Sequence, residues 1–291
     1  MCCSLTERMF ELEQIDSLMA RKAKAVPYVK RSEADQRLVE SAGPEFLEAL
    51  ARGLRVIEAF GRDRRQLTLS DAAKVVDLPR ASVRRTLSTL VQLGYAETDG
   101  RLFKLTPRIL TLASSYLQAN PLSEILQPAL ERTSLAVNEA CSSAVLDGED
   151  VVMIAHASPN RLVAVSAQIG LRLPAVSSSL GRVLLAALDD RALDKFLARI
   201  KPAKLTPTTV TDRGELRKAI VKARADGYSL VDQEVEVGFR SISVPLRRLD
   251  GKTIAALNIG THSERCSLDT MRKVFLPKLL ETAGELQRQL I

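Results

Sequence analysis

The chain has 291 residues, a formal net charge of +7 and 46% hydrophobic residues. Because an ordinary domain has about 100–200 residues, we expect two domains, each with its own core. No apolar run approaches the roughly 18 residues that span a bilayer, and the four cysteines show no CxxC spacing. These features exclude a membrane protein and a disulfide scaffold, and they favour a cytoplasmic location.

Residues 1–45 have the composition of an extension rather than of a folded unit. They carry 7 basic and 8 acidic side chains, and Gly43-Pro44 at their end is a turn signal. We expect this N-terminal extension to be disordered and to contribute little to the fold. Met9 and Met19 could each begin a shorter chain.

From residue 46 onward the pattern predicts three short helices. The first ends at Gly61, which has the position of a C-cap, and Thr68 or Ser70 can cap the second. Pro79 suits the first turn of a third helix over residues 79–93. The apolar residues at helical spacing are Phe46, Leu47, Leu50, Leu54, Ile57 and Phe60, then Ala72, Ala73 and Val76, and finally Val83, Leu87, Leu90 and Val91.

A β-hairpin is expected directly after the third helix. Asp99-Gly100 stands between β-prone segments, and a type I′ turn with positive φ at both central residues accounts for this pair. Helix, helix, turn, helix, hairpin is the order of a winged helix-turn-helix. Residues 46–106 also carry 11 basic and 7 acidic side chains, the densest positive charge of the chain. We therefore predict that this domain binds double-stranded DNA.

The third helix presents small and basic side chains on its outer face if Val83 and Leu87 pack inward. Small side chains permit close approach to the groove, and arginines bind phosphates or a guanine edge. An ordinary solvated helix is the alternative, and the basic stretch 21–31 could be an arm that touches DNA. The residues expected to contact DNA are Arg80, Ala81, Ser82, Arg84, Arg85, Ser88, Arg101 and Lys104.

Residues 107–120 are expected to form a linker helix. Its apolar side chains are Ile109, Leu110, Leu112, Ala113, Tyr116 and Leu117. An apolar face of this width must be buried against something. We favour the same helix of a partner protomer over packing within the chain.

Residues 121–291 predict an α+β domain with one mostly antiparallel sheet and helices around it. Helices are expected over 122–139, from Ser178 or Ser179 to 188, and over 190–200, 212–226 and 268–290. Strands are expected over 141–146, 151–157, 161–169, 228–235, 241–247 and 253–260.

With these elements placed, residues 46–291 closely resemble the isocitrate-lyase-regulator (IclR) family of bacterial transcription factors. The resembling segments are LARGLRVIEAFG at 50–61, LPRASVRRTLSTLVQLGY at 78–95, RLPAVSSSLGRVLLAAL at 172–188, DGYSLVDQEVEVGFRSISVPL at 226–246 and IAALNIGTH at 254–262. Within the family, the segments at 95–117 and 231–246 look most like the branch that controls protocatechuate, 4-hydroxybenzoate and β-ketoadipate catabolism.

The resemblance implies a GAF-like effector-binding domain and assembly into a homodimer or homotetramer. It places the effector between the sheet and the start of the 180–188 helix, against Ser179, Leu180, Gly181, Ser241, Asn258 and Gly260. A helix N-terminus favours a small carboxylate, and serines can add donors. The alternative is that these serines only cap the helix and satisfy buried strand groups. Val231 departs from the acidic residue of many members, which favours a different or more apolar ligand.

Three arginines of this domain, Arg161, Arg172 and Arg182, could also meet an anion, although each is more typical of a solvated surface charge. No phosphate-binding glycine loop, nucleophile elbow or metal-spaced His/Cys set is found in the sequence. We therefore expect no enzyme, no cofactor and no metal. The expected function is an effector-responsive activator of aromatic-acid catabolic genes, with RNA polymerase as a partner. The alternative is a repressor of an unrelated carboxylate or sugar-acid operon.

Overall fold

The computed structural model describes residues 43–61, 63–119, 122–159 and 169–290. The chain divides into two compact units after Ser114, a position inside the expected linker helix. The expected extension of residues 1–45 lies almost entirely outside the described residues. Within the described ranges, no helix is both long and apolar enough to cross a membrane.

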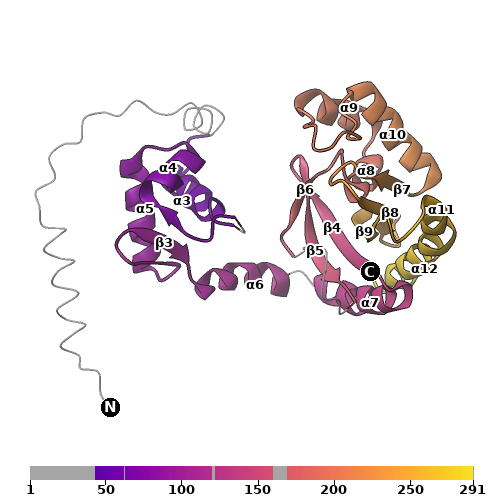
Figure 1. Ribbon diagram of the computed structural model, residues 1–291, viewed down its shortest axis with the longest axis horizontal. Helices are drawn as coiled ribbons and strands as arrows, with labels where there is room; N and C mark the ends of the chain where they lie inside the picture. Colours follow the sequence, from indigo (N-terminus) through magenta and orange to yellow (C-terminus); the bar gives the residue numbers. More distant parts are fainter. Residues whose placement is uncertain (1–42, 62, 120–121, 160–168, 291) are drawn as a thin grey trace, which may run out of the picture. The chain divides into compact units, whose positions relative to one another are not determined.

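The first unit consists of three helices and a small antiparallel sheet with strand order β1-β3-β2. Its helices and β3 are labelled in Figure 1. This arrangement confirms the predicted winged helix-turn-helix. The two-residue strand β1 was too short to be predicted. The elements are α3 (Glu48–Glu58), β1 (Leu67–Thr68), α4 (Leu69–Val76), α5 (Arg80–Gln92), β2 (Ala96–Thr98) and β3 (Leu102–Leu105).

Local signals set the helix ends in this unit. The Thr68 side chain accepts a hydrogen bond from the Asp71 amide at 3.2 Å, which confirms the predicted cap of α4. Asp77 ends α4 in a left-handed conformation, with φ of 50°. Pro79 is the N-cap of α5 rather than a residue of its first turn. The turn between α4 and α5 therefore has three residues, 77–79, a length typical of a helix-turn-helix.

The predicted type I′ turn of the hairpin is wrong, although the hairpin itself is confirmed. Gly100 has a φ of +93°, whereas Asp99 is not among the described residues with positive φ. Asp99 instead folds the loop with its side chain, because its Oδ1 accepts from the amides of Arg101 (2.8 Å) and Leu102 (2.7 Å). The hairpin has three loop residues between β2 and β3, so a single left-handed glycine suffices.

The apolar stripe of α3 is only partly used inside the first unit. Val56 is fully buried in its core, together with residues of α4 and α5. Leu47, Leu50 and Leu54 of the same stripe are 69%, 61% and 49% exposed. Helical spacing therefore predicted an apolar face correctly, but this part of it has no partner within the unit.

The chain continues through a 3₁₀ turn (Pro107–Ile109) into α6 (Leu110–Ala119), which confirms the expected linker helix. The further elements are α7 (Leu122–Val137), β4 (Ala140–Asp147), β5 (Asp150–Ala157), β6 (Arg172–Pro174), α8 (Ser179–Ala186), α9 (Asp190–Arg199), α10 (Arg213–Asp226), β7 (Ser229–Asp232), β8 (Phe239–Arg247), β9 (Thr253–His262), α11 (Leu268–Thr270) and α12 (Leu276–Gln287).

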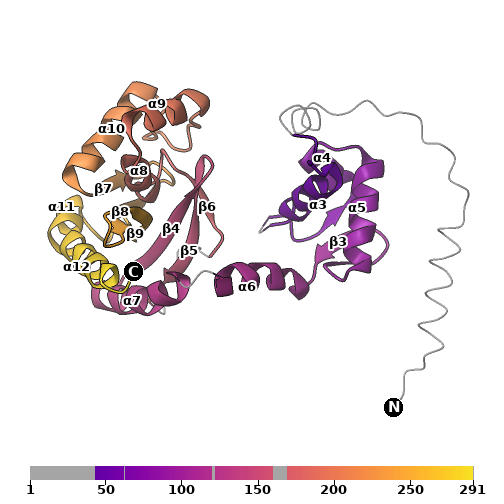
Figure 2. The ribbon, with the colours of Figure 1, turned by 180° about the vertical axis from the view of Figure 1, so that it is seen from behind.

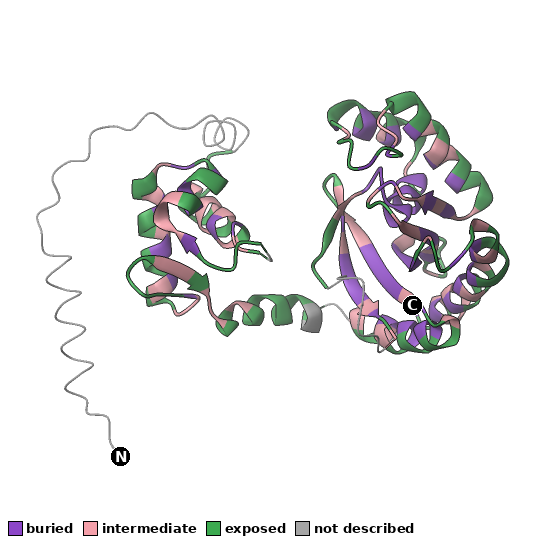
Figure 3. Ribbon diagram, in the orientation of Figure 1, coloured by how far each residue is buried: buried purple, intermediate pink, exposed green. Residues whose placement is uncertain are grey.

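A six-stranded antiparallel sheet with order β6-β5-β4-β9-β8-β7 forms the centre of the second unit. Helices α7 and α12 pack on one face, and α8, backed by α9 and α10, packs on the other (Figures 1 and 2). Figure 3 shows the buried residues gathered along the strands and α8. Two cores therefore lie on opposite faces of one sheet, which confirms the α+β prediction.

One predicted element of this unit differs from the structure, and another cannot be compared with it. The expected C-terminal helix over 268–290 is interrupted by a π-helical turn, Met271–Phe275, just before Pro277. Pro277 has no amide hydrogen, so the regular helical bonding cannot pass through it. The expected strand over 161–169 lies almost entirely outside the described residues, and the short strand β6 was not predicted.

Helix α8 is buried along its whole length. It approaches the preceding segment very closely at Gly181, where an added Cβ would lie 2.1 Å from the backbone oxygen of Ala175. Only a glycine fits at this distance. The local sequence VSSSLG therefore fixes both the start of α8 and its closest contact.

Replacement of this glycine tests the packing. Gly181→Ala should lower the stability of the second unit by about 1–3 kcal/mol, because the backbone atoms of Ala175 cannot yield as a flexible side chain could. The matched control is Gly284→Ala in α12, where an added Cβ meets nothing within 4 Å and where a gain of about 0.4–1 kcal/mol is expected. Urea unfolding followed by circular dichroism would show the difference, and equal midpoints for the two variants would contradict it.

Candidate nucleic-acid interface and ligand site

The outer face of α5 is basic and exposed. Val83, Leu87 and Leu90 are buried on the opposite side of the helix. Of the residues predicted to contact DNA, Arg80, Ala81, Arg84, Arg85, Ser88, Arg101 and Lys104 are exposed and Ser82 is half-buried. The structure therefore brings the helical members together on one surface.

The basic residues of the predicted DNA-contacting set differ in whether they form an ion pair with a carboxylate of the chain. Among the described residues, no ion pair involves Arg80, Arg84 or Arg85. Lys104 on the hairpin pairs with Glu97, with 2.6 Å between Nζ and Oε1, and this contact raises the pKa of Lys104. The arginines of α5 are thus available to an anionic partner, whereas Lys104 already has one.

A cluster of three hydroxyls lies where α8 meets the sheet. Ser179 is the first residue of α8, and its hydroxyl donates to Ser241 Oγ at 2.7 Å. It also shares a hydrogen bond of 2.7 Å with Ser243 Oγ. All three side chains are at least 95% buried. Ser178, rather than Ser179, caps the helix by accepting from the Gly181 amide.

Two predicted residues of β9 lie beside this cluster. Gly260 pairs in register with Ser241, and Asn258 pairs with Ser243. Asn258 is 6% exposed, and its Oδ1 has no hydrogen-bond partner among the described residues. A buried acceptor without a donor is unusual in a folded protein. The sheet therefore presents an unsatisfied amide oxygen next to the hydroxyl cluster.

The remaining predicted ligand residues have packing roles. Leu180 is buried in the core around α8, and Gly181 permits the approach to Ala175. Gly260 leaves room for the ring of Phe239, since an added Cβ would lie 2.6 Å from it. Both positions are occupied by glycine because a larger side chain would not fit there, and not because glycine contacts a ligand.

Arg182 was expected at the surface, and the structure corrects this. It is 5% exposed, and its Nη2 lies 2.7 Å from Oε2 of Glu234, which also accepts from the Val210 amide. Its Nε donates to the backbone oxygen of Val176. Arg172 pairs with carboxylates at the surface, and Arg161 lies outside the described residues. A buried arginine that is already paired supports the start of α8 rather than a free anion site.

Sequence reasoning missed Ser243 and Glu234. The segment Ser241-Ile-Ser243 on a strand places both serines on one face, since side chains alternate with a period of two. That signal could have found Ser243. Glu234 lies 52 residues from Arg182, and nothing in the local sequence indicates this pairing.

Metal and thiol chemistry find no support in the described part of the chain. No group of three or more His, Cys, Asp or Glu side chains there could hold a metal ion. Cys141 and Cys266 are free and buried. Burial raises the pKa of Cys141 to about 12, so its thiol stays protonated and unreactive at neutral pH.

Both units match known family models. Residues 49–100 match the IclR helix-turn-helix domain, and residues 114–288 match the C-terminal domain of the bacterial transcriptional regulator IclR. Because these models cover more than half of the chain, it belongs to the IclR family. It is therefore a DNA-binding transcription regulator with an effector domain, and not an enzyme.

Individual relatives extend this similarity over nearly the whole chain. The Pca regulon regulatory protein of Pseudomonas putida is 42% identical over 93% of this chain and 94% of the relative. The p-hydroxybenzoate hydroxylase transcriptional activator of Acinetobacter baylyi is 34% identical over 84% of this chain and 92% of the relative. A crystal structure of an IclR homologue from Microbacterium hydrocarbonoxydans with 4-hydroxybenzoate has a TM-score of 0.69 at 29% identity, covering 83% of this chain and 98% of that one.

The outer face of α5 can be tested by removing its central arginines. Arg84→Ala with Arg85→Ala should weaken operator binding by at least about 1–3 kcal/mol, the range expected for one base-reading arginine. The matched control removes the adjacent exposed pair Arg272 and Lys273 from the second unit and should leave affinity unchanged. Gel-shift titrations on a specific site measure both effects. Equal affinity of the α5 variant and the parent would show that α5 does not read DNA.

Proposed function

We propose that this protein activates genes for the breakdown of aromatic acids in response to a small carboxylate effector. The names of the Pseudomonas and Acinetobacter relatives support the pathway, and the Microbacterium structure supports an aromatic carboxylate. The observation that carries the proposal is the buried hydroxyl cluster of Ser179, Ser241 and Ser243 at the start of α8. The unsatisfied amide oxygen of Asn258 beside this cluster supports a bound polar ligand.

The start of α8 suits a carboxylate. Its first amides have no carbonyl one turn earlier to bond, and the helix dipole leaves partial positive charge there. Ser241 on β8 accepts from the Ser179 hydroxyl and so keeps its own hydroxyl proton to donate to a carboxylate. Each serine oxygen can take part in more than one hydrogen bond, so a ligand can join the cluster. The proposed effector site therefore has Ser179, Ser241 and Asn258 as its polar residues, with Ser243 added, and Leu180, Gly181 and Gly260 shape it by their packing.

Two substitutions test this site. Ser241→Ala and Asn258→Ala should each leave a buried ligand atom unpaired, which costs about 1–3 kcal/mol or roughly five- to a hundredfold in affinity. Calorimetric titration with 4-hydroxybenzoate, protocatechuate and β-ketoadipate measures this loss. Operator affinity of each variant should match the parent and serves as the internal control. The proposal fails if no such carboxylate binds the parent at millimolar concentration.

The DNA contacts of the proposal are those of α5 and the hairpin. Arg80, Arg84 and Arg85 read bases or grip phosphates, and Ala81, Ser82 and Ser88 permit close approach to the groove. Arg101 and Lys104 reach flanking phosphates. Helix-turn-helix proteins of this kind bind two half-sites as dimers.

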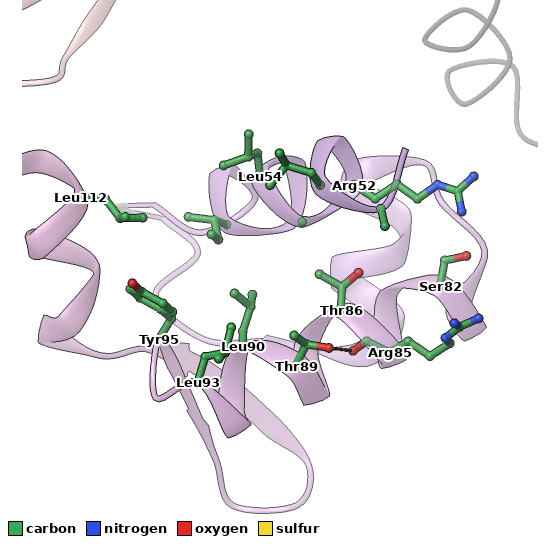
Figure 4. A pocket seen from close by; sticks show the side chains of 14 residues that line it. Arg52, Leu54, Ser82, Arg85, Thr86, Thr89, Leu90, Leu93, Tyr95 and Leu112 are labelled. Carbon is green, nitrogen blue, oxygen red and sulfur yellow. Dashed lines mark hydrogen bonds between the residues drawn. The ribbon is translucent and has the colours of Figure 1, made fainter. Parts of the chain in front are cut away.

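A homodimer is supported by the apolar surface of the first unit. An open groove of about 510 Å³ lies between α3 and α5, closed at one end by Tyr95 and Leu112 (Figure 4). Leu54, Leu93 and Leu112 on its rim are 49–51% exposed. A second copy of the chain is the proposed occupant, because the exposed Leu47 and Leu110 extend the same apolar character beyond the groove, which Leu50 also lines. The Leu117 side chain, expected on this face, lies outside the described residues.

A charge placed in this surface should separate the protomers. Leu112→Glu would bury an unpaired carboxylate at the interface, which shifts the protein toward the monomer. Leu249→Glu is the control, since Leu249 is 66% exposed in the second unit. Light scattering should show a lower mass for Leu112→Glu alone. An unchanged oligomer would place the dimer interface elsewhere.

The direction of regulation is tested by transcription with purified RNA polymerase. An activator raises transcription from its own promoter when the effector is present. Relatives named as repressors, such as AllR of Salmonella typhi at 26% identity, support the alternative of a repressor of another operon. If the regulator instead lowers transcription and the effector restores it, the protein is a repressor.

A further inference from the structure

A row of polar side chains crosses the sheet of the second unit at one level. Register pairs Ser229 with Ser243, Ser243 with Asn258, Asn258 with Ser142, and Ser142 with His156. The row thus runs over five strands, β7-β8-β9-β4-β5, which lie about 4.8 Å apart. Register partners share one face of a sheet. Because Ser243 is hydrogen-bonded to a residue of α8, this face is the one that α8 covers.

The surroundings of this polar row are apolar. Ala144, Met153 and Ala256 of the same strands pack with α8 in a core of aliphatic side chains. The four residues of the row from β7 to β4 are buried, and His156 is half-buried. Polar groups in such a core lower stability unless each finds a hydrogen-bond partner. One acceptor of the row, Asn258 Oδ1, has no such partner among the described residues, and this points to a bound polar molecule.

The unpartnered atom of the row specifies the chemistry of that molecule. Asn258 Oδ1 accepts hydrogen bonds, and no described residue donates to it. A carboxylate oxygen cannot fill this role, because two acceptors repel each other. A hydroxyl group of the ligand can donate here.

Ser142 and His156, the next two positions of the row, complete the partner set of a hydroxyl. Ser142 Oγ and His156 Nδ1 are 2.9 Å apart. Burial lowers the pKa of His156, so its ring is neutral at neutral pH and has one donor and one acceptor nitrogen. Either tautomer leaves the Ser142–His156 pair with one donor and one acceptor beyond their mutual bond. A ligand hydroxyl that donates its one proton to Asn258 Oδ1 still has lone pairs, which can accept from the free donor of the pair.

We infer that Asn258, Ser142 and His156 bind a hydroxyl group of the effector, at the end opposite the carboxylate held by Ser179 and Ser241. From β8 to β4 is two strand spacings, roughly 10 Å, a separation that one aromatic ring with a hydrogen bond at each end can bridge. The inference rests on the proposed effector site and narrows its ligand to hydroxylated aromatic carboxylates. A keto-dicarboxylate such as β-ketoadipate has no hydroxyl for Asn258.

The test compares ligands that differ only in this hydroxyl. Calorimetry on the parent should show 4-hydroxybenzoate binding about five- to a hundredfold more tightly than benzoate. The ether 4-methoxybenzoate, which cannot donate to Asn258, should lose this advantage. In Ser142→Ala and His156→Phe the ratio of the affinities for 4-hydroxybenzoate and benzoate should fall toward one. The affinity for benzoate itself should stay that of the parent. Ser142→Thr keeps the hydroxyl and should restore the preference.

Ser143→Ala is the matched control. Ser143 is a buried neighbour whose register partner, Leu257, belongs to the core on the opposite face, so its removal should leave the preference for the hydroxyl unchanged. Equal preference in Ser142→Ala, His156→Phe and the parent overturns this inference alone. So does equally tight binding of the methoxy ligand. Absence of binding of both benzoate and 4-hydroxybenzoate to the parent overturns the proposed effector site and the inference with it.

Discussion

The buried ion pair between Arg182 and Glu234 holds the second unit together around α8. Arg182 lies in a helix without a solvent-exposed face, so its charge would be isolated in a medium of low dielectric without Glu234. Loss of one partner of such a pair is strongly destabilising, by about 3–5 kcal/mol. Glu234 also receives the Val210 amide, and Thr209 donates to the Glu234 backbone oxygen. One carboxylate thus ties α8 to two loops that are distant in sequence.

This constraint explains why the start of α8 is a fixed platform. Gly181 lets the helix approach Ala175 closely, and the next residue, Arg182, is held by its ion pair with Glu234. Ser179 is thereby held against β8, where its hydroxyl meets two strand serines. A ligand that accepts from the Ser241 hydroxyl bonds to the same group that holds Ser179, so ligand binding and the contact between helix and strand are coupled.

Much of this architecture could be predicted from local patterns. Helical spacing, the Thr68 cap and the Asp99-Gly100 signal gave the first unit, because each depends on residues close in sequence. The α8 site was predicted as a set of residues from family resemblance. Its partners Glu234 and Ser142 could not be, because register and tertiary packing bring them there from distant segments. The stripe of α3 shows the same limit: spacing shows that Leu50 is on an apolar face, but not which molecule covers it.

The ion pair on the hairpin has a consequence for ionic strength. A protein cation that neutralises a DNA phosphate releases condensed counterions, so the logarithm of affinity falls by about 0.9 per phosphate for each unit of log salt. Lys104 is already neutralised by Glu97. When it turns to a phosphate, Glu97 is left to attract a cation from solution, which offsets the ion released from the DNA. On the interface proposed above, the slope of affinity against salt therefore counts the unpaired arginines of α5 and undercounts Lys104.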